Sequence, residues 1–317
     1  MSATVVVPTW NGAERLGRLL ESLDDDAQVI VVDNGSTDDT SNVLRKRFRD
    51  VDVLRLPRNE GFSRAVNRAA ARATGDVLVL LNDDCVCEER FVHRLSSGVD
   101  RVAGRVMAAG VLLEARDTSV IDTAGMELDG TLRVFDYLNG APVSVLETTP
   151  PPPIGPSGAA AAFYRGAFLE AGGFDEQLFA YWEDVDLVLR LRLAGAGCEL
   201  VTNARAVHGH SSTLGAGSSA KDYLTGFGRG YVMRKWGVLT RRGAASAAMY
   251  ELATCAAQLA FDRTSSGALG RLRGWKAAAT TPRFEPPRRL LPRRTIVHEA
   301  QRRWSRRRRV RGGGRSG

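Results

Sequence analysis

Cysteine is scarce in this sequence, with four residues in 317 and no CxxC pair among them. Neither a disulfide framework nor a zinc ribbon is therefore indicated, and reduced thiols are expected. The loop after the first apolar run reads Pro-Thr-Trp-Asn-Gly and lacks the glycine pattern G-x-G-x-x-G, which argues against a nicotinamide-dependent dehydrogenase. The chain also shows no internal repeat.

Long hydrophobic runs are missing too. The most apolar late stretch, residues 244–261, is interrupted by Glu251 and Gln258 and consists mostly of alanine, so it predicts a helix and no membrane span. The N-terminus leads straight into an apolar strand pattern, without a basic region or a cleavage site, which predicts a chain without a signal peptide. Together these features predict a cytoplasmic protein.

Positive charge is abundant, but only at one end. The formal net charge is +8; residues 263–317 carry 17 of the 44 Lys and Arg and 2 of the 36 Asp and Glu, net +15, so residues 1–262 carry net −7. The hydrophobic content of 44% and the charged content of 25% are typical of globular proteins. The sequence therefore predicts an acidic globular part followed by a basic tail.

Short apolar runs alternate with segments of helical apolar spacing early in the chain; the runs are residues 4–7, 29–32, 51–56 and 77–81. This alternation is typical of βαβ units, so the predicted fold class is α/β, with a single, mainly parallel sheet flanked by helices. The last run is apolar at every position, as expected of a central strand covered on both faces. Later patterns predict strands near residues 102–113 and 199–202, and helices near residues 187–193, 220–236 and 244–261.

Polar residues follow each of the four runs, at positions 8–12, 33–40, 58–63 and 82–84. The carboxyl ends of parallel strands meet at one edge of a sheet, and open α/β sheets bind their ligands there. One or two such loops would be ordinary turn chemistry. Four of them predict a binding site.

Asn82, Asp83 and Asp84 form the loop after the central run. Clustered acids repel one another unless a cation is present, and a hard divalent ion takes oxygen ligands and can hold a diphosphate as well. The loop therefore favours a metal and diphosphate site. The competing interpretation is a solvated turn in which Asp84 caps a helix that starts near Glu88.

Asp33 and Asn34 follow the second run. A carboxylate there can accept hydrogen bonds from a base or a ribose, and Gly35 permits close backbone approach. The competing interpretation is a turn with Ser36 or Thr37 as a helix N-cap.

Glu183, Asp184 and Asp186 lie at the predicted start of a helix, beside Tyr181 and Trp182. One carboxylate is a candidate general base, held near aromatic surface that can receive a sugar ring. The competing interpretation is that these acids cap the helix and complement its dipole, and for Asp186 we favour it.

Two histidines, His208 and His210, flank Gly209. This spacing can turn one imidazole toward a metal, although a lone histidine is more often structural.

Four segments resemble, in order and spacing, the inverting glycosyltransferases of family 2, which have the GT-A fold; they are residues 8–12 (PTWNG), 31–38 (VVDNGSTD), 59–67 (NEGFSRAVN) and 81–84 (LNDD). Later matches continue the resemblance to about residue 213; they are Arg165, residues 172–176 (GGFDE), residues 183–187 (EDVDL), Arg190 and His208. Asn82 replaces the first acid of the family's Asp-x-Asp signature, as in its rhamnosyltransferase-like branch. An amide adds no charge to a metal site.

The resemblance implies a role for each matching residue. Asp84 and His208 would bind Mg²⁺ or Mn²⁺, and Asp184, with Glu183 beside it, would be the catalytic base. The donor would be bound by Pro8, Thr9, Asn11, Asp33, Asn34, Asn59, Gly61, Asn67, Asn82 and Asp83. The acceptor would be bound by Arg165, Tyr181 and Trp182.

The resemblance further implies an inverting transfer of a sugar from dTDP-rhamnose or a UDP-sugar to a glycan or lipid-linked acceptor in cell-envelope polysaccharide synthesis. We expect a GT-A domain at residues 1–240, a helical extension at 241–282 and a basic, disordered tail at 283–317. The tail predicts contact with the inner face of the plasma membrane. Two alternatives remain: a nucleic-acid-binding protein that acts through this tail, and a catalytically inactive homologue that binds nucleotide sugars.

Overall fold

The computed structural model describes residues 1–23, 27–209, 218–240 and 243–285. His210 and almost all of the predicted basic tail lie outside these residues. The strands are β1 (Ala3–Thr9), β2 (Gln28–Asp33), β3 (Asp52–Arg55), β4 (Val77–Leu81), β5 (Cys85–Cys87), β6 (Arg105–Glu114), β7 (Asp117–Thr123), β8 (Met126–Leu128), β9 (Val134–Asp136), β10 (Ala160–Tyr164) and β11 (Gly197–His208). The helices are α1 (Ala13–Glu21), α2 (Thr40–Arg47), α3 (Phe62–Arg72), α4 (Phe91–Ser97), α5 (Arg165–Glu170), α6 (Glu183–Leu193), α7 (Ser219–Lys235), α8 (Ala244–Ala257) and α9 (Ser266–Ala277), with shorter turns η1 (Val143–Thr148), η2 (Val238–Thr240) and η3 (Gln258–Asp262).

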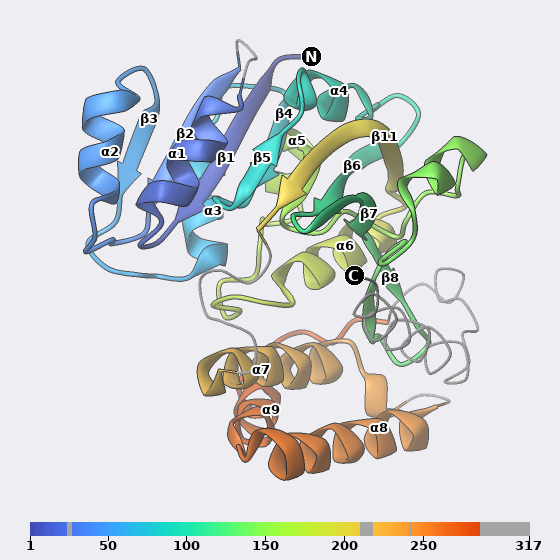
Figure 1. Cartoon of the computed structure of the whole chain (residues 1–317). Helices are drawn as coiled ribbons and strands as arrows, with labels where there is room; N and C mark the ends of the chain where they lie inside the picture. Colours follow the sequence, from blue (N-terminus) through green and yellow to red (C-terminus); the bar gives the residue numbers. More distant parts are fainter. Residues whose placement is uncertain (24–26, 210–217, 241–242, 286–317) are drawn as a thin grey trace, which may run out of the picture.

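Nine of the described strands form one sheet in the order β3-β2-β1-β4-β10-β6-β11-β5, with β7 paired to β6 (Figure 1). Strands β3, β2, β1 and β4 run parallel, as the sequence predicted. Strand β10 then runs antiparallel to both β4 and β6, so the second half of the sheet is mixed. The predicted α/β class with helices on the sheet is confirmed.

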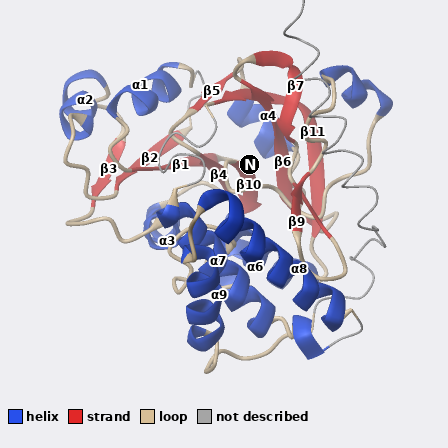
Figure 2. Ribbon diagram, turned by 60° about the horizontal axis from the view of Figure 1, so that its bottom comes forward, coloured by secondary structure: helices blue, strands red, loops and turns tan. Residues whose placement is uncertain are grey.

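Alternating side chains along β1 divide the core into two layers. Val5 and Val7 pack with Leu16 of α1 on one face of the sheet, while Val6 packs with Val66 of α3 on the other. Every residue of β4 is fully buried, because both faces of this central strand are covered. Figure 2 shows α1 and α2 on one side of the parallel strands and α3 and α6 on the other.

Several predicted boundaries shift in the structure. Strand β6 begins at Arg105, because Val102 lies in the preceding turn and is 97% exposed. Asp84 does not cap a helix; strand β5 follows it and pairs with β11, and α4 begins only at Phe91. The turn after β2 also differs, since the residue before α2 is Asp39 and neither Ser36 nor Thr37.

Helices α7, α8 and α9 form a layer beside the sheet domain, visible at the bottom of Figure 1. Glycines let α7 and α9 approach backbone to backbone: a Cβ atom on Gly230 would clash with the carbonyl of Arg271, and one on Gly270 with that of Tyr223. Such close approach is available only to residues without a side chain. The extension is therefore locked onto α7, which itself begins just after the sheet domain. No helix in the described ranges is long and apolar enough to cross a bilayer.

Candidate active site

A pocket of about 670 Å³ opens at the carboxyl ends of β1 and β4. This is the edge that the polar loops predicted, and the volume suits a nucleotide-sized ligand. The predicted site residues that line it are Pro8, Thr9, Asn34, Asn59, Asn82, Asp83, Asp84, Tyr181, Glu183, Asp184 and His208.

Carboxylates dominate the lining of this pocket. Among the described residues that border it are Asp83, Asp84, Asp122, Asp136, Glu183 and Asp184, against two basic side chains, His208 and Lys221. Such an excess of negative charge repels an anionic ligand unless a cation is held between them. The pocket is therefore suited to a divalent ion together with a phosphorylated ligand.

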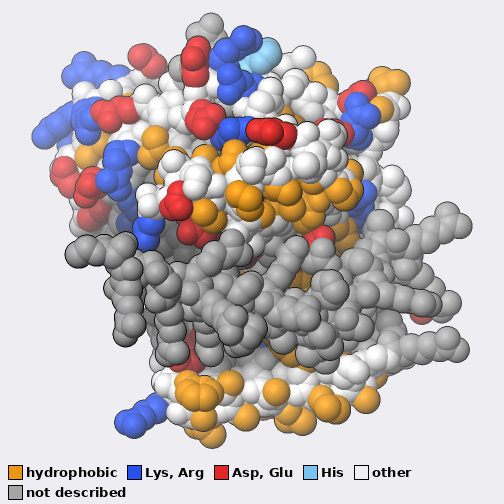
Figure 3. Space-filling model, turned by 45° about the vertical axis from the view of Figure 1, so that its right-hand side comes forward, with side chains coloured by type: hydrophobic (Ala, Val, Ile, Leu, Met, Phe, Trp, Pro, Cys, Tyr) orange, Lys and Arg blue, Asp and Glu red, His pale blue; other side chains and the backbone are white. Residues whose placement is uncertain are grey.

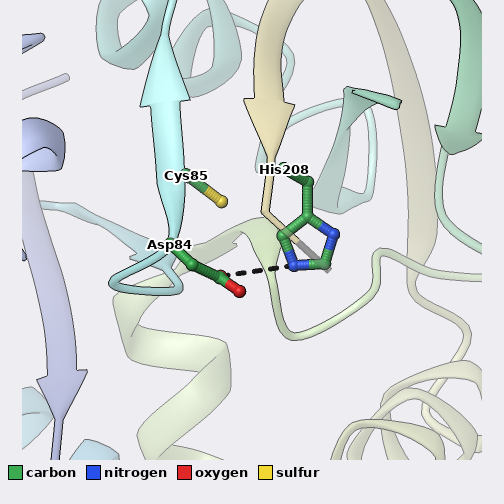
Figure 4. Close-up of side chains that lie close together, drawn as sticks. All are labelled: Asp84, Cys85 and His208. Carbon is green, nitrogen blue, oxygen red and sulfur yellow. Dashed lines mark ion pairs between the residues drawn. The ribbon is translucent and has the colours of Figure 1, made fainter. Parts of the chain in front are cut away.

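Asp84 and His208 lie next to each other because Asp84 directly precedes β5, which pairs with the end of β11. Asp84 Oδ1 is 3.3 Å from His208 Nε2 (Figure 4). On the other side of the ring, His208 Nδ1 is 2.8 Å from Asp122 Oδ2. Burial opposes a charge on this imidazole, but hydrogen bonds and attraction from Asp122 and Asp84 outweigh it and raise the pKa of His208 to about 9. A metal binds the neutral imidazole, so an ion attracted by Asp84 and Asp122 would displace the proton from Nε2, and the oxygen of Asp84 with this nitrogen would then suit Mg²⁺ or Mn²⁺.

Cys85 completes a group of three possible ligands, because its sulfur lies close to the Asp84 and His208 atoms. Burial, with Asp84 adding to it, raises the pKa of this thiol well above its usual range. A metal binds the thiolate, so a thiol that stays protonated is a poor ligand. The donor set that remains is Asp84 and His208.

Glu183 and Asp184 begin α6 and also line the pocket. The two residues before them, Tyr181 and Trp182, both have positive φ angles, 68° and 75°. Non-glycine residues in this region are strained, and such strain collects at functional sites. The turn presents the carboxylates at the first turn of the helix.

The two carboxylates differ in their partners. Asp184 accepts hydrogen bonds from the backbone N–H of Gly158 at 3.1 Å and of Val185 at 2.8 Å, whereas Glu183 Oε2 is buried without a partner. Burial raises the pKa of both, and repulsion from Asp184 raises that of Glu183 further, well above its ordinary value. Of the two carboxyls, Asp184 therefore carries a negative charge more readily than Glu183.

Residues 4–110 match the family model described as Glycosyl transferase family 2. The N-acetylglucosaminyl-diphospho-decaprenol L-rhamnosyltransferase of Mycobacterium tuberculosis is 30% identical over 237 residues, which cover 67% of this chain and 77% of that protein. The chain belongs to glycosyltransferase family 2. The succinoglycan biosynthesis protein ExoA of Rhizobium meliloti is 29% identical to this glycosyltransferase over 208 residues, covering 61% of this chain and 59% of that protein.

Solved structures show the fold of the glycosyltransferase. GalNAc-T7, solved with UDP, GalNAc and Mn²⁺, has a TM-score of 0.58 at 18% identity, covering 74% of this chain and 48% of that chain. The mannosyltransferase PcManGT of Pyrobaculum calidifontis, solved with GDP-Man and Mn²⁺, has a TM-score of 0.50 at 18% identity, covering 88% and 87%. The glycosyltransferase therefore has the predicted GT-A fold.

Three residues that were predicted to bind the donor do not line the pocket but hold nearby loops in place. Asn11 Oδ1 accepts a hydrogen bond from the backbone N–H of Thr37, and Asn67 accepts one from Phe174. Gly61, with φ of 91°, lies against Phe179 so closely that a side chain would clash. These residues of the glycosyltransferase shape the loops rather than line the pocket.

Asp33 also lies outside the main pocket, in a separate hollow. Its carboxylate accepts hydrogen bonds from the Ser36 N–H at 2.8 Å and the Ser41 hydroxyl at 2.7 Å. A role in stabilising this turn is therefore enough to explain an acid at this position. A nucleoside contact of Asp33 stays a prediction. The carboxylate of Asp83 also has hydrogen-bond partners within the protein, because the Thr9 hydroxyl and the Arg15 guanidinium donate to its oxygens.

The structure places two of the residues that were predicted to bind the acceptor outside the lining of this pocket. Arg165 follows the C-terminal end of β10, and β10 is antiparallel to β4, so Arg165 lies at the opposite edge of the sheet; its backbone N–H donates to Asp76. Trp182 turns away from the pocket to pack under the guanidinium of Arg229, 5.3 Å from its ring centre. Of the three predicted acceptor residues, Tyr181 alone lines the pocket.

Asp186 is not a helix cap, as we had favoured, but a fully buried acid. It accepts hydrogen bonds from Arg190, Lys235 and Trp236, each at 2.9 Å. Because Asp186 lies two residues after Asp184, it points to the far side of α6, toward α7.

The sequence analysis missed Asp122 and Lys221. Asp122 ends β7, which pairs with β6 beside β11 and so brings it to His208. Neither residue belongs to a recognisable motif, and the only signal for Asp122 was a short strand with an acid at its end.

Proposed function

We propose that this glycosyltransferase moves a sugar from a nucleoside diphosphate donor, dTDP-rhamnose or a UDP-sugar, to a hydroxyl of a glycan or lipid-linked acceptor, with inversion at the anomeric carbon. The observation that carries the proposal is one pocket that is lined both by the Asp184 carboxylate and by the Asp84 and His208 pair. The relatives named for rhamnosyl transfer to a decaprenol-linked acceptor and for succinoglycan biosynthesis support a role in cell-envelope polysaccharide synthesis.

Asp84 and His208 would hold Mg²⁺ or Mn²⁺, and the ion would supply positive charge that offsets the charge of the leaving diphosphate. Lys221, at the rim of the pocket, would add to it. Asn82 would contribute amide contacts to the donor without charge. These residues would all serve the donor, so the carboxylates at the start of α6 would be available to bind and activate the acceptor.

The transfer is a single displacement. The acceptor oxygen forms a bond to the anomeric carbon as the bond from that carbon to the diphosphate oxygen breaks on the opposite face. Asp184 takes the proton of the acceptor hydroxyl, so the products are a glycoside, a nucleoside diphosphate and a protonated base. Tyr181, which lines the pocket next to this base, offers a ring face to the acceptor sugar.

Binding of nucleotides tests the donor site. We expect UDP or dTDP to bind measurably in the presence of Mn²⁺ and much more weakly without it, because the acidic pocket repels a bare diphosphate. Titration calorimetry with UDP, dTDP and GDP measures this. Asp84→Ala is expected to abolish the dependence on Mn²⁺, and absence of binding by any nucleotide would mean that the family fold here serves another purpose.

Asp122 is expected to strengthen the metal site through His208. Its carboxylate keeps a proton on Nδ1, which leaves Nε2 to face the ion; losing such a partner typically costs about 10- to 100-fold in metal affinity. We therefore expect Asp122→Asn to weaken Mn²⁺ binding by a factor in this range, measured by calorimetry or by electron paramagnetic resonance of free Mn²⁺. Asp117→Asn is the matched control, since Asp117 is an exposed acid on the same strand whose carboxylate accepts hydrogen bonds from Ser119. Equal affinities of the two variants would contradict this role.

A further inference from the structure

The helical extension carries a large apolar surface that nothing in the described chain covers. Six large hydrophobic residues of α8, η3 and α9 are between 44% and 85% exposed to solvent; they are Met249, Leu252, Leu259, Phe261, Leu269 and Leu272. In Figure 3 hydrophobic side chains line the bottom of the molecule, where Figure 1 places α8. We call these six residues the apolar face.

The orientation of α8 is fixed by its one charged residue. Glu251 is buried and accepts hydrogen bonds from Arg229 and Arg271, each at 2.7 Å, so this side of the helix is anchored inward. Met249 and Leu252 of α8 and Leu259 of η3 are spaced by three and seven residues, so they share one side, which is exposed. A surface helix normally shows the reverse arrangement, with its charges in water.

Basic residues surround the apolar face. Arg263, Arg273 and Lys276 are exposed on the same segment, against two exposed acids, Asp262 and Glu285. Residues 286–317 follow directly and contain 12 Arg and one Glu, a net charge of +11. The partner of this surface must therefore accept apolar side chains and carry negative charge.

We propose that the apolar face docks the protein on the surface of an anionic lipid bilayer. Apolar side chains of a surface-lying helix enter the boundary between headgroups and acyl chains, while neighbouring Lys and Arg attract acidic headgroups. No membrane-spanning helix is needed for this contact. The inference rests on the surface alone and does not depend on the proposed transfer reaction.

A second copy of the chain is the other apolar partner to consider. A symmetric dimer through α8 would bring two segments of charge +11 toward each other, and this repulsion opposes it. An anionic bilayer neutralises the same charge. The electrostatics therefore favour lipid over self-association.

Cosedimentation of the full chain with vesicles tests the proposal. We expect binding to vesicles of phosphatidylcholine with phosphatidylglycerol, weaker binding to phosphatidylcholine alone, and a loss of at least about tenfold in partitioning for the double variant Leu252→Glu with Phe261→Glu. Val102→Glu is the matched control, because Val102 is 97% exposed and lies in the sheet domain. Circular dichroism and nucleotide binding verify that each variant is folded.

Three results would overturn the proposal. They are failure of the wild-type chain to bind either vesicle, undiminished binding by the double variant, and an equal loss with Val102→Glu. Light scattering that shows a dimer, converted to a monomer by the double variant, together with no vesicle binding, would assign the apolar face to a second copy instead. Nucleotide binding is measured separately, so a failure here leaves the donor site intact.

Discussion

Asp184→Asn is expected to reduce the rate of sugar transfer by about 10²- to 10⁴-fold, the usual contribution of general base catalysis. The amide has nearly the same shape, but it cannot take the acceptor's proton, and its single oxygen can accept only one of the two hydrogen bonds that Gly158 and Val185 donate to different oxygens of Asp184. Binding of the nucleotide should change little, because the metal is assigned to Asp84 and His208, which the substitution leaves in place. Initial rates with a radiolabelled donor, together with calorimetry of the nucleoside diphosphate, measure both quantities.

Glu183→Gln is the matched control for this experiment. Burial and repulsion from Asp184 raise the pKa of the Glu183 carboxyl well above its ordinary value, so a neutral amide at this position is expected to disturb the site less. We expect this variant to retain far more activity than Asp184→Asn. The reverse order of the two activities would move the base from Asp184 to Glu183, and normal turnover in both would remove the pair from catalysis.

The pH dependence of transfer adds an independent check. Burial raises the pKa of Asp184, so the ionised base is present at high pH and is lost as the pH falls through this raised value. The rate should therefore decline toward acid at a higher pH than an ordinary aspartate would give. Asp184→Asn should lack this limb of the profile.

The parallel half of the sheet was predictable because its signals are local. The runs that became β1, β2, β3 and β4 are short and rich in β-branched or aliphatic residues, and each is followed by polar residues. The rule that parallel strands share a carboxyl edge then placed Asn82, Asp83 and Asp84 correctly in one pocket. No knowledge of distant contacts was needed for this part.

The second half of the site depends on strand direction, which the sequence does not reveal. Arg165 was misplaced because β10 enters the sheet antiparallel and reverses the edge at which its end lies. Asp122 was missed because it lies 86 residues from His208 in the sequence. The two side chains meet through the pairing of β7 with β6 and of β6 with β11, which the sequence does not reveal. The prediction that Asp186 caps its helix was wrong because Asp186 is buried against helix α7, a contact that the local sequence pattern does not reveal.

Lys235→Met is expected to lower the free energy of unfolding by about 3–5 kcal/mol, the loss typical when one partner is removed from a buried ion pair. Lys235 is almost fully buried, and its Nζ lies 2.7 Å from Asp175 and 2.9 Å from Asp186. Methionine fills a similar volume but leaves Asp175 without the Lys235 cation and leaves Asp186 with the cation of Arg190 alone. Asp175 lies before α6, and Lys235 is the last residue of α7. This ion pair therefore also connects the segment that leads into α6 to the helix on which the helical extension packs.

Denaturant unfolding of Lys235→Met at several pH values measures this loss and its origin. Burial alone would raise the pKa of Asp175, but the hydrogen bond and charge of Lys235, with the Tyr231 hydroxyl, hold it below the ordinary value. A depressed pKa contributes stability above the unfolded-state pKa that is lost as the pH falls through the folded-state pKa. The difference between wild type and variant should therefore be largest near neutral pH and shrink in acid. Lys276→Met, which removes an exposed lysine from α9, should change stability by no more than about 0.5 kcal/mol; a loss as large as that of Lys235→Met would show that net charge, and not the buried ion pair, sets the stability.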